Sequence, residues 1–112
     1  MKLVATSIAG NELSDMAKKG FGSMVKAVVD VKKRIMVIDA SLHADEEAHL
    51  IAHGSKQDDL WGINIYPELT GDDFIEFDSM INLRPNRGNT TRSVDSPHVQ
   101  KQIRNIVLEL VK

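Results

Sequence analysis

The clearest pattern along the chain is an alternation of apolar and polar residues between Leu60 and Pro85. Successive side chains of a β-strand point to opposite faces of its sheet, so this alternation predicts two strands with one apolar and one polar face. The apolar face takes Trp61, Ile63, Ile65, Ile75, Phe77, Ile81 and Leu83, and the polar face takes Asn64, Tyr66, Glu76, Asp78, Asn82 and Arg84. We therefore expect residues 75–84 to form one extended strand that presents its charged side chains outward.

A β-hairpin is predicted upstream of this segment. Residues 24–31 and 34–39 are rich in β-branched side chains, which favour strands. The short segment that joins them has no glycine or asparagine to take a left-handed backbone, so we expect mild strain at Lys33 or Arg34. Residues 2–6 alternate more weakly and predict a short edge strand.

Three amphipathic helices are predicted around these strands. One covers residues 11–19, and the second follows Ser41 and ends near Gly54. The third is the clearest, because Ser96 is a typical N-cap residue and Pro97 suits the first position of a helix. The apolar residues that recur at helical spacing in this last segment are Val99, Ile103, Ile106, Val107 and Leu110. We expect the helices to cover one face of the sheet.

Together these elements predict an α+β fold in a single domain, residues 1–112. It would have a mainly antiparallel sheet of four or five strands and about three helices, with the C-terminal helix packed on the sheet. The length of 112 residues and the hydrophobic fraction of 42% fit one domain. The absence of cysteine excludes thiol catalysis and disulfides. Without a long apolar run or the apolar core of a signal peptide, we expect a cytoplasmic protein that does not contact the membrane.

Charge is unevenly placed along the chain. Residues 39–78 hold eleven acidic residues against Lys56 alone, a net charge of −10, whereas the segments on either side carry about +4 each. Blocks of this kind either form complementary solvated surfaces within one fold or steer two copies of a chain together. On the second interpretation we expect a homo-oligomer, with a dimer favoured.

Histidines supply the first candidate chemistry. His49 and His53 are four residues apart on one predicted helix, a spacing that can place two imidazoles on one metal ion. The match to a metal site is weak, because no acid follows the first histidine and the spacing identifies no third ligand. Solvated histidines on a helix face are the simpler interpretation. His43, near Asp39, suits a capping or buried hydrogen-bonded role better than that of a general base, and it stays a catalytic candidate.

The polar face of the predicted sheet supplies the second candidate chemistry. Glu76 and Asp78 would suit acid–base catalysis if one carboxyl were desolvated, so they join His43 as catalytic candidates. The simpler interpretation is a water-facing surface with a salt bridge to Arg84. Lys26 across the sheet, or a metal ion, could also balance the two acids.

An arginine-rich segment at residues 84–92 supplies the third. Three arginines with glycine, asparagine and threonine donors could form a concave anion site, since guanidinium groups match carboxylate and phosphate geometry. A solvated loop whose arginines pair with the acidic middle of the chain is the simpler alternative. The candidate ligand-binding residues of the second and third surfaces are Asn64, Tyr66, Asn82, Arg84, Arg87, Asn89 and Arg92.

The chain has no dinucleotide, P-loop or kinase motif and no Ser–His–acid arrangement, and we predict no cofactor. Aromatic residues make up 4% of the chain and the net charge is −2, which disfavours nucleic acid as a partner. We therefore expect a small binding or interaction protein that self-associates and holds a small anion. The alternative is a small metal-dependent or acid–base hydrolase that acts on an anionic substrate.

Four distinctive runs cover most of the chain: MVKAVVDVKKRIMVID (24–39), LHADEEAHL (42–50), GSKQDDLWGINIYP (54–67) and IEFDSMINLRPNRGN (75–89). In these runs the chain resembles a family of small uncharacterised prokaryotic proteins, a domain of unknown function. It departs from the family pattern at Arg34, where a glycine is common. The resemblance implies a freestanding single-domain protein and supplies no activity, cofactor or catalytic residue.

Overall fold

The computed structural model describes all 112 residues, which form five β-strands, three α-helices and four short 3₁₀ turns. The strands are β1 (Lys2–Val4), β2 (Val25–Asp30), β3 (Ile35–Ile38), β4 (Leu60–Ile65) and β5 (Ile75–Glu76). The helices are α1 (Gly10–Lys19), α2 (His43–Ala52) and α3 (Pro97–Leu110). The 3₁₀ turns are η1 (Gln57–Asp59), η2 (Gly71–Asp73), η3 (Met80–Asn82) and η4 (Pro85–Arg87). The predicted α+β class, with the C-terminal helix against an antiparallel sheet, is confirmed.

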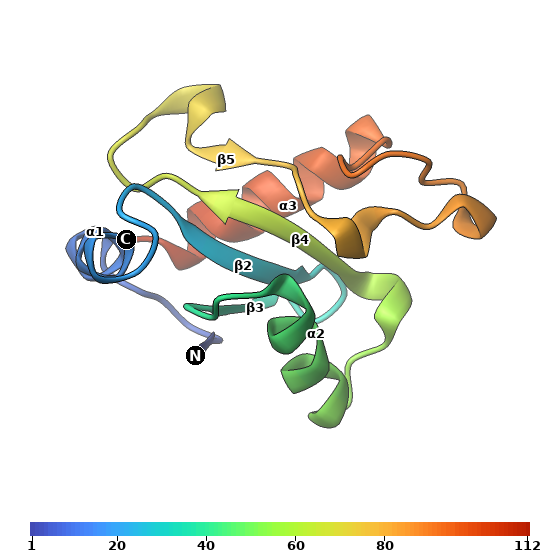
Figure 1. Cartoon of the computed structure of the whole chain (residues 1–112), viewed down its shortest axis with the longest axis horizontal. Coiled ribbons are helices and arrows are strands. Elements are labelled where there is room, and N and C mark those ends of the chain that lie inside the picture. Colours follow the sequence, from blue (N-terminus) through green and yellow to red (C-terminus); the bar gives the residue numbers. More distant parts are fainter.

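The five strands form one sheet in the order β1-β3-β2-β4-β5, and every neighbouring pair is antiparallel. β2 and β4 make the longest pairing, which runs from Val25 opposite Ile65 to Asp30 opposite Leu60. Because β4 pairs with β2 rather than with β3, the chain leaves β3, forms α2 and returns on the far side of β2 (Figure 1). This crossover places α2 beside the middle of the sheet.

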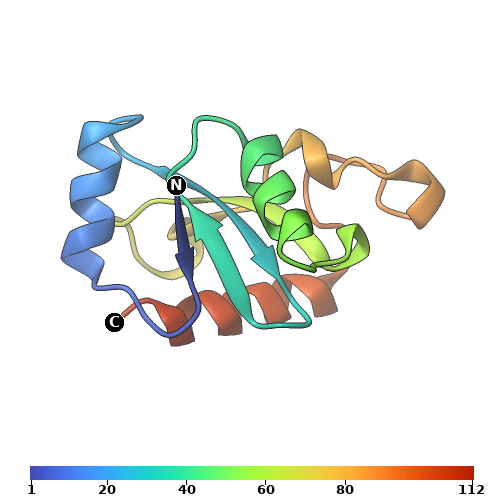
Figure 2. The same ribbon diagram turned by 90° about the horizontal axis from the view of Figure 1, so that it is seen from below.

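The sheet is covered on both faces. α1 and α3 pack on one face in the larger apolar cluster, where Leu13 and Ile106 meet Ile63 of β4. On the opposite face Leu50 of α2 joins Val28 in a smaller cluster. Figure 2 shows α3 below the sheet and α2 above it. The expectation that the helices cover one face is therefore wrong, because the second face also carries apolar residues that need cover.

The β2–β3 hairpin is held by a buried carboxylate. Asp30 is fully buried, and its Oδ1 accepts the backbone N–H groups of Lys32 and Lys33 at 2.9 Å each. Its Oδ2 accepts the hydroxyl of Ser55 at 2.6 Å. Arg34 has a φ of 58°, in the left-handed region that glycine prefers, which confirms the strain expected in this turn.

The prediction of one extended strand over residues 75–84 is wrong beyond Glu76. β5 has two residues, and the chain then turns through η3, where the Ser79 hydroxyl accepts the N–H of Ile81 at 3.3 Å. The turn sends apolar side chains to different faces: Phe77 packs on the α3 side of the sheet and Ile81 on the α2 side. The alternating pattern of this segment therefore does not reflect an extended backbone.

A side-chain amide takes the place of the missing strand. Oδ1 of Asn82 accepts the N–H of Gly62 at 2.8 Å, and Nδ2 donates to the carbonyl of the same glycine at 2.9 Å. The segment approaches β4 so closely that a Cβ on Gly62 would lie 2.6 Å from the Cβ of Ser79. Asn82 thus satisfies the edge of β4 as a neighbouring strand would.

The segment between η3 and α3 is organised by Asn89, which is 5% exposed. Its Nδ2 donates to the carbonyls of Asn82 and Ser93 at 2.7 and 2.8 Å, and its Oδ1 accepts the N–H of Asp95 at 2.8 Å. These bonds fix the path of a segment that has almost no apolar side chains, and so they fix the position of Arg92 within it.

Candidate functional site

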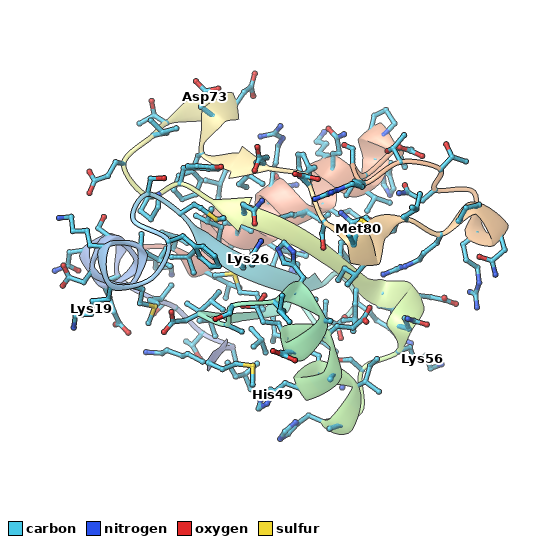
Figure 3. All side chains as sticks on the ribbon, in the orientation of Figure 1. Lys19, Lys26, His49, Lys56, Asp73 and Met80 are labelled. Atoms are coloured by element: carbon cyan, nitrogen blue, oxygen red, sulfur yellow. The ribbon has the colours of Figure 1, made fainter.

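A cleft of about 210 Å³ opens on the α2 side of the sheet, between the start of α2 and the η3 turn. Its lining residues come from four separate elements and loops: Lys26, Leu42, His43, Ala44, Ser79, Met80, Ile81 and Arg92. Three of them are basic and none is acidic, so we call this the cationic cleft. Figure 3 labels Lys26 on β2 and Met80 on η3, the elements that contribute two of its sides.

Lys26 contributes a positive charge from the strand itself. It is the only lysine of the chain that is not exposed, and none of the ion pairs in the structure includes its ammonium group. Its Nζ lies 5.3 Å from the centroid of the Phe21 ring. A partly buried charge without a counter-charge is costly, so this position favours an anion from solution.

Arg92 reaches the cleft from the loop before α3. Its carbonyl accepts the N–H of Ser79 and the Nδ2 of Asn82, both at 3.0 Å, which anchors its backbone. Its Nε donates to Oδ1 of Asp78 at 2.8 Å, and no hydrogen bond occupies its two terminal nitrogens. The guanidinium group is therefore oriented while its terminal N–H donors stay free for a ligand.

His43 is the first residue of α2 and is 7% exposed. Its Nε2 lies 2.7 Å from the carbonyl oxygen of Ile63, and since a carbonyl can only accept, Nε2 carries the proton and Nδ1 the lone pair. Burial lowers the pKa of His43 below 6.5; the Ile63 carbonyl and Asp78 oppose this shift, while Lys26 and Arg92 add to it. The imidazole is neutral at pH 7. The prediction of a buried, hydrogen-bonded histidine is confirmed.

The first turn of α2 adds backbone donors to the cleft. The N–H groups of His43 and Ala44 have no hydrogen-bond partner, and Leu42 at the N-cap has no side-chain group to supply one. All three residues line the cleft. The positive end of the helix dipole therefore adds to the positive potential of the basic side chains.

Polar residues at the paired ends of β4 and β5 form a hydrogen-bonded cluster that adjoins Lys26 through Asn64. Nδ2 of Asn64 and the hydroxyl of Tyr66 both donate to Oε1 of Glu76, at 2.8 and 3.2 Å. Burial raises the pKa of Tyr66, and the charge of Glu76 raises it further. Asn64 is 4% exposed and lies directly opposite Lys26 in the β2–β4 pairing. Its Oδ1 is buried and has no partner.

A second cleft, of about 390 Å³, lies along the arginine-rich segment, and its charges are balanced. Arg87 forms an ion pair with Asp58, and Nη2 of Arg84 lies 3.8 Å from Oε2 of Glu47. Arg84 also donates to two backbone carbonyls, and its guanidinium lies 4.8 Å from the centroid of the Trp61 ring. Burial lowers the pKa of Arg84, and Glu47 opposes that shift. This arginine fastens the segment to β4.

All three arginines of residues 84–92 pair with an acid from residues 39–78, which confirms the pairing that the simpler alternative predicts, although the segment is not fully solvated, because Asn89 is buried. The predicted salt bridge between the acidic sheet residues and Arg84 is wrong, because Asp78 pairs with Arg92 instead. The η3 turn accounts for the exchange: it separates Arg84 from β5 and directs its side chain to Glu47 of α2.

The sequence matches, over residues 2–110, a family described as protein of unknown function (DUF5674). The chain belongs to this family. The predicted membership of a family of unknown function is thereby confirmed, and the description of the DUF5674 family assigns no activity or ligand. No curated protein and no solved structure matches the chain. None of the three helices of this DUF5674 protein has the length and apolarity that crossing a membrane requires.

Other predicted site residues of this DUF5674 protein lie away from the cationic cleft or inside the fold. Asn82 and Asn89 are buried, and internal hydrogen bonds occupy their amide groups, so neither offers a free group to a ligand. His49 and His53 stack with their ring centroids 4.4 Å apart, and Nδ1 of His53 lies 2.7 Å from the carbonyl oxygen of His49. No group of three or more histidines and acids is arranged to hold a metal ion.

The cleft brings together His43 and Arg92 from the predicted set, with Asp78 beside them as the ion-pair partner of Arg92. Sequence reasoning missed Lys26 as a site residue. One signal was available in the sequence: Lys26 is the one charged residue within the apolar strand run VKAVV. The residues on either side of it in β2 are buried, so its side chain starts from the interior of the sheet. Sequence reasoning also missed the free backbone donors of α2, which only the position of the helix start reveals.

Proposed function

We propose that this protein binds a small anion in the cationic cleft. The observation that carries the proposal is the convergence of Lys26, His43 and Arg92, which come from three distant parts of the chain, on one cleft without an acidic lining residue. Lys26 has no ion-pair partner, and the terminal nitrogens of Arg92 are unoccupied. An anion would supply the counter-charge that Lys26 lacks and would accept hydrogen bonds from the terminal nitrogens that Asp78 leaves free on Arg92.

The charge balance favours this cleft over the larger one along the arginine-rich segment. Arg84 and Arg87 there are each matched by an acid, Glu47 and Asp58, within ion-pairing distance. An anion that entered that cleft would meet two carboxylates as well as two guanidinium groups. No acid lines the cationic cleft, and Asp78 beside it holds Nε of Arg92 while leaving the terminal nitrogens of that guanidinium free.

The chemistry of the donors indicates a carboxylate or a phosphate. A guanidinium edge, an ammonium group and two backbone N–H groups at a helix start all match oxygen anions, and each can bond to a different oxygen of one ligand. A volume of about 210 Å³ admits a small ligand rather than a polymer. The exposed Leu42 and Met80 on the same cleft would contact an apolar part of that ligand.

Isothermal titration calorimetry with inorganic phosphate tests the proposal. We expect saturable binding to the wild type and a loss of affinity of at least about tenfold in both Lys26→Ala and Arg92→Ala, because each removes a charge-assisted contact. Arg87→Ala is the matched control, since it removes an arginine of the same segment that lines the other cleft. Equal weakening by Arg87→Ala, or no binding to the wild type, would count against the cationic cleft.

We also propose that the chain self-associates, through the outer edge of β1. This strand pairs with β3 on one side only, Leu3 is exposed on it, and Met1 is exposed just before it. An open edge with apolar residues can pair with the same edge of a second copy. Sedimentation of the wild type should report a dimer, and Leu3→Lys should shift it towards monomer. A monomer at all protein and salt concentrations would remove this part of the proposal.

A further inference from the structure

We propose that His43 is the general base for hydrolysis of a phosphate monoester bound in the cationic cleft. The inference rests on the proposed anion site and goes beyond it, because it assigns a reaction to a cleft that binding alone would not require. Its basis is the combination, in one small cleft, of two cationic groups suited to phosphate and a histidine nitrogen with a free lone pair.

The hydrogen bonding of His43 determines which nitrogen can act. Nε2–H is committed to the carbonyl of Ile63 at 2.7 Å, which fixes the tautomer with the lone pair on Nδ1. No hydrogen bond occupies Nδ1, and it is absent from the buried atoms that lack a partner. Since the residue lines the cleft, Nδ1 is the atom that a bound water molecule can reach.

Burial is the main reason that the pKa of the imidazole is lowered, and the charged groups that face it act in both directions. Lys26 of β2 and Arg92 of the loop before α3 lower the pKa of His43, because they disfavour a positive charge on the imidazole. Asp78 raises that pKa, and its Oδ1 also accepts the hydrogen bond from Nε of Arg92. The neighbouring acids of α2 are directed elsewhere. Oε2 of Glu46 accepts the N–H of Ala40, and Glu47 faces Arg84 on the other side of the helix.

Water is the only other reactant that hydrolysis of the monoester needs. Lys26, the terminal nitrogens of Arg92 and the free N–H groups of α2 hold the non-bridging phosphate oxygens. A water oxygen forms a new bond to phosphorus as Nδ1 of His43 takes one of its protons. The bond from phosphorus to the ester oxygen breaks and its electron pair leaves with that oxygen, which takes a proton from solvent because it departs on the side opposite to the attacking water, and Nδ1 releases its own proton to solvent. The products are inorganic phosphate and an alcohol.

The rim of the cleft suits the organic part of such a substrate. Leu42 and Met80 are 58% and 61% exposed, and both line the cleft. Two flexible apolar side chains beside a charged interior match a molecule with a phosphate at one end and an apolar or aromatic group at the other. We therefore choose para-nitrophenyl phosphate as the probe.

The decisive variant is His43→Gln. A glutamine amide can still donate to the Ile63 carbonyl in place of Nε2–H, but it has no group that takes a proton from water at neutral pH. The experiment measures two quantities for each variant: the dissociation constant for inorganic phosphate by calorimetry and the rate of release of para-nitrophenol. His98→Gln, an exposed histidine on α3, is the matched control.

We expect the wild type and His98→Gln to hydrolyse the probe equally. His43→Gln should bind phosphate within about twofold of the wild type and lose at least about a hundredfold in rate, the usual contribution of a general base. Wild-type protein that binds phosphate but hydrolyses nothing, or full activity in His43→Gln, would overturn the catalytic role and leave the anion site standing. Failure to bind phosphate would overturn the proposed function itself.

If His43→Gln does not fold, a measurement on the wild type alone still tests the role of His43. The pH dependence of kcat/KM reports the ionisation of the free protein, so the rate should fall on acidification only below pH 6.5, where His43 gains a proton. Hydrolysis whose kcat/KM already falls between pH 8 and pH 7, or which rises on acidification, would contradict a role for this histidine.

Discussion

Several positions on the strand face that the sequence predicts to be polar and water-facing are packed inside the fold, and Gly62 is the simplest case. It lies in the middle of β4, where a glycine ordinarily weakens a strand. Here the missing side chain is what lets the η3 segment approach, since any Cβ would lie 2.6 Å from both Cβ and Oγ of Ser79. The polar surface predicted for this face is therefore covered by the chain itself at Gly62.

Gly62→Ala should destabilise the protein by about 2 to 3 kcal/mol, because the added methyl group overpacks a contact with Ser79 that has no free space. Urea unfolding measures the change. Gly10→Ala is the matched control: no heavy atom lies within 4 Å of its added Cβ, and alanine favours the start of α1. If Gly62→Ala were as stable as Gly10→Ala, the close packing of η3 on β4 would be refuted.

Glu46 is the second residue whose role burial decides. It is fully buried on α2, its Oε2 accepts the N–H of Ala40 at 3.1 Å, and its Oε1 has no partner. Burial raises its pKa to about 9, and the nearby charge of Lys26 opposes the shift while that of Asp39 adds to it. The folded protein therefore keeps a proton on Glu46 at neutral pH that the unfolded chain releases.

Stability should therefore fall as the pH rises from 4.5, the ordinary pKa of this carboxyl, towards 9. Glu46→Gln removes the ionisation, so we expect it to exceed the wild type in stability by about 3 kcal/mol at pH 7 and to match it near pH 4.5. Thermal unfolding at a series of pH values measures this. The exposed Glu68→Gln should follow the wild type throughout, and a wild type with no loss above pH 4.5 would show that Glu46 ionises normally.

At the scale of elements, the segment from η3 to α3 is built on side-chain amides. Asn82 pairs with both backbone groups of Gly62, and Asn89 joins the two sides of the loop that follows. These amides satisfy backbone groups that regular secondary structure would otherwise satisfy. They also hold Arg92 beside His43, since the carbonyl of Arg92 accepts Nδ2 of Asn82.

Asn82→Ala should destabilise the protein by at least about 3 kcal/mol, because it leaves the N–H and carbonyl of Gly62 buried without partners. Limited proteolysis should then cut the segment between η3 and α3 faster than in the wild type. Asn86→Ala, an exposed asparagine in the same segment, should change neither property. Equal behaviour of the two variants would mean that Asn82 does not hold this segment.

The sequence was sufficient for the elements with local signals. Ser96 caps α3 as predicted, accepting the N–H of Val99 at 3.3 Å, and the hairpin turn shows its strain at Arg34. The strand predicted through residues 75–84 failed because alternation does not distinguish a strand from a turn whose polar residues bond inward. From the sequence, Asn82 is expected to point outward as a polar residue of a strand. Its burial is explained only by the packing of the η3 segment on Gly62.

Only part of the candidate site could be inferred from sequence, because its residues meet through the tertiary fold. His43 and Arg92 were among the candidates, yet nothing local indicates that they share a cleft. Lys26 was considered only as a partner for Glu76 and Asp78, and the absence of any ion pair that makes it a site residue is a property of the folded chain. Arg84 looked the same as Arg92 in sequence and proved to be a structural contact on Trp61.

At the scale of the whole molecule, the charge blocks of the sequence are only partly paired within the fold. Four ion pairs join an arginine of residues 79–112 to an acid of residues 39–78: Arg84–Glu47, Arg87–Asp58, Arg92–Asp78 and Arg104–Asp72. No ion pair joins the basic N-terminal block to the acidic middle. Lys26, the one partly buried cation of that N-terminal block, is thus left with an unmatched charge on the sheet.

The most direct test of the anion site is an amide NMR titration of the wild type with inorganic phosphate. If the cationic cleft is the site, the largest saturable shifts will come from His43 and Ala44, whose N–H groups are free, and from Lys26 and Arg92. Amides around Arg87 should stay in place. Shifts centred on Arg84 and Arg87, or scattered weakly over all basic residues, would contradict the assignment of the site.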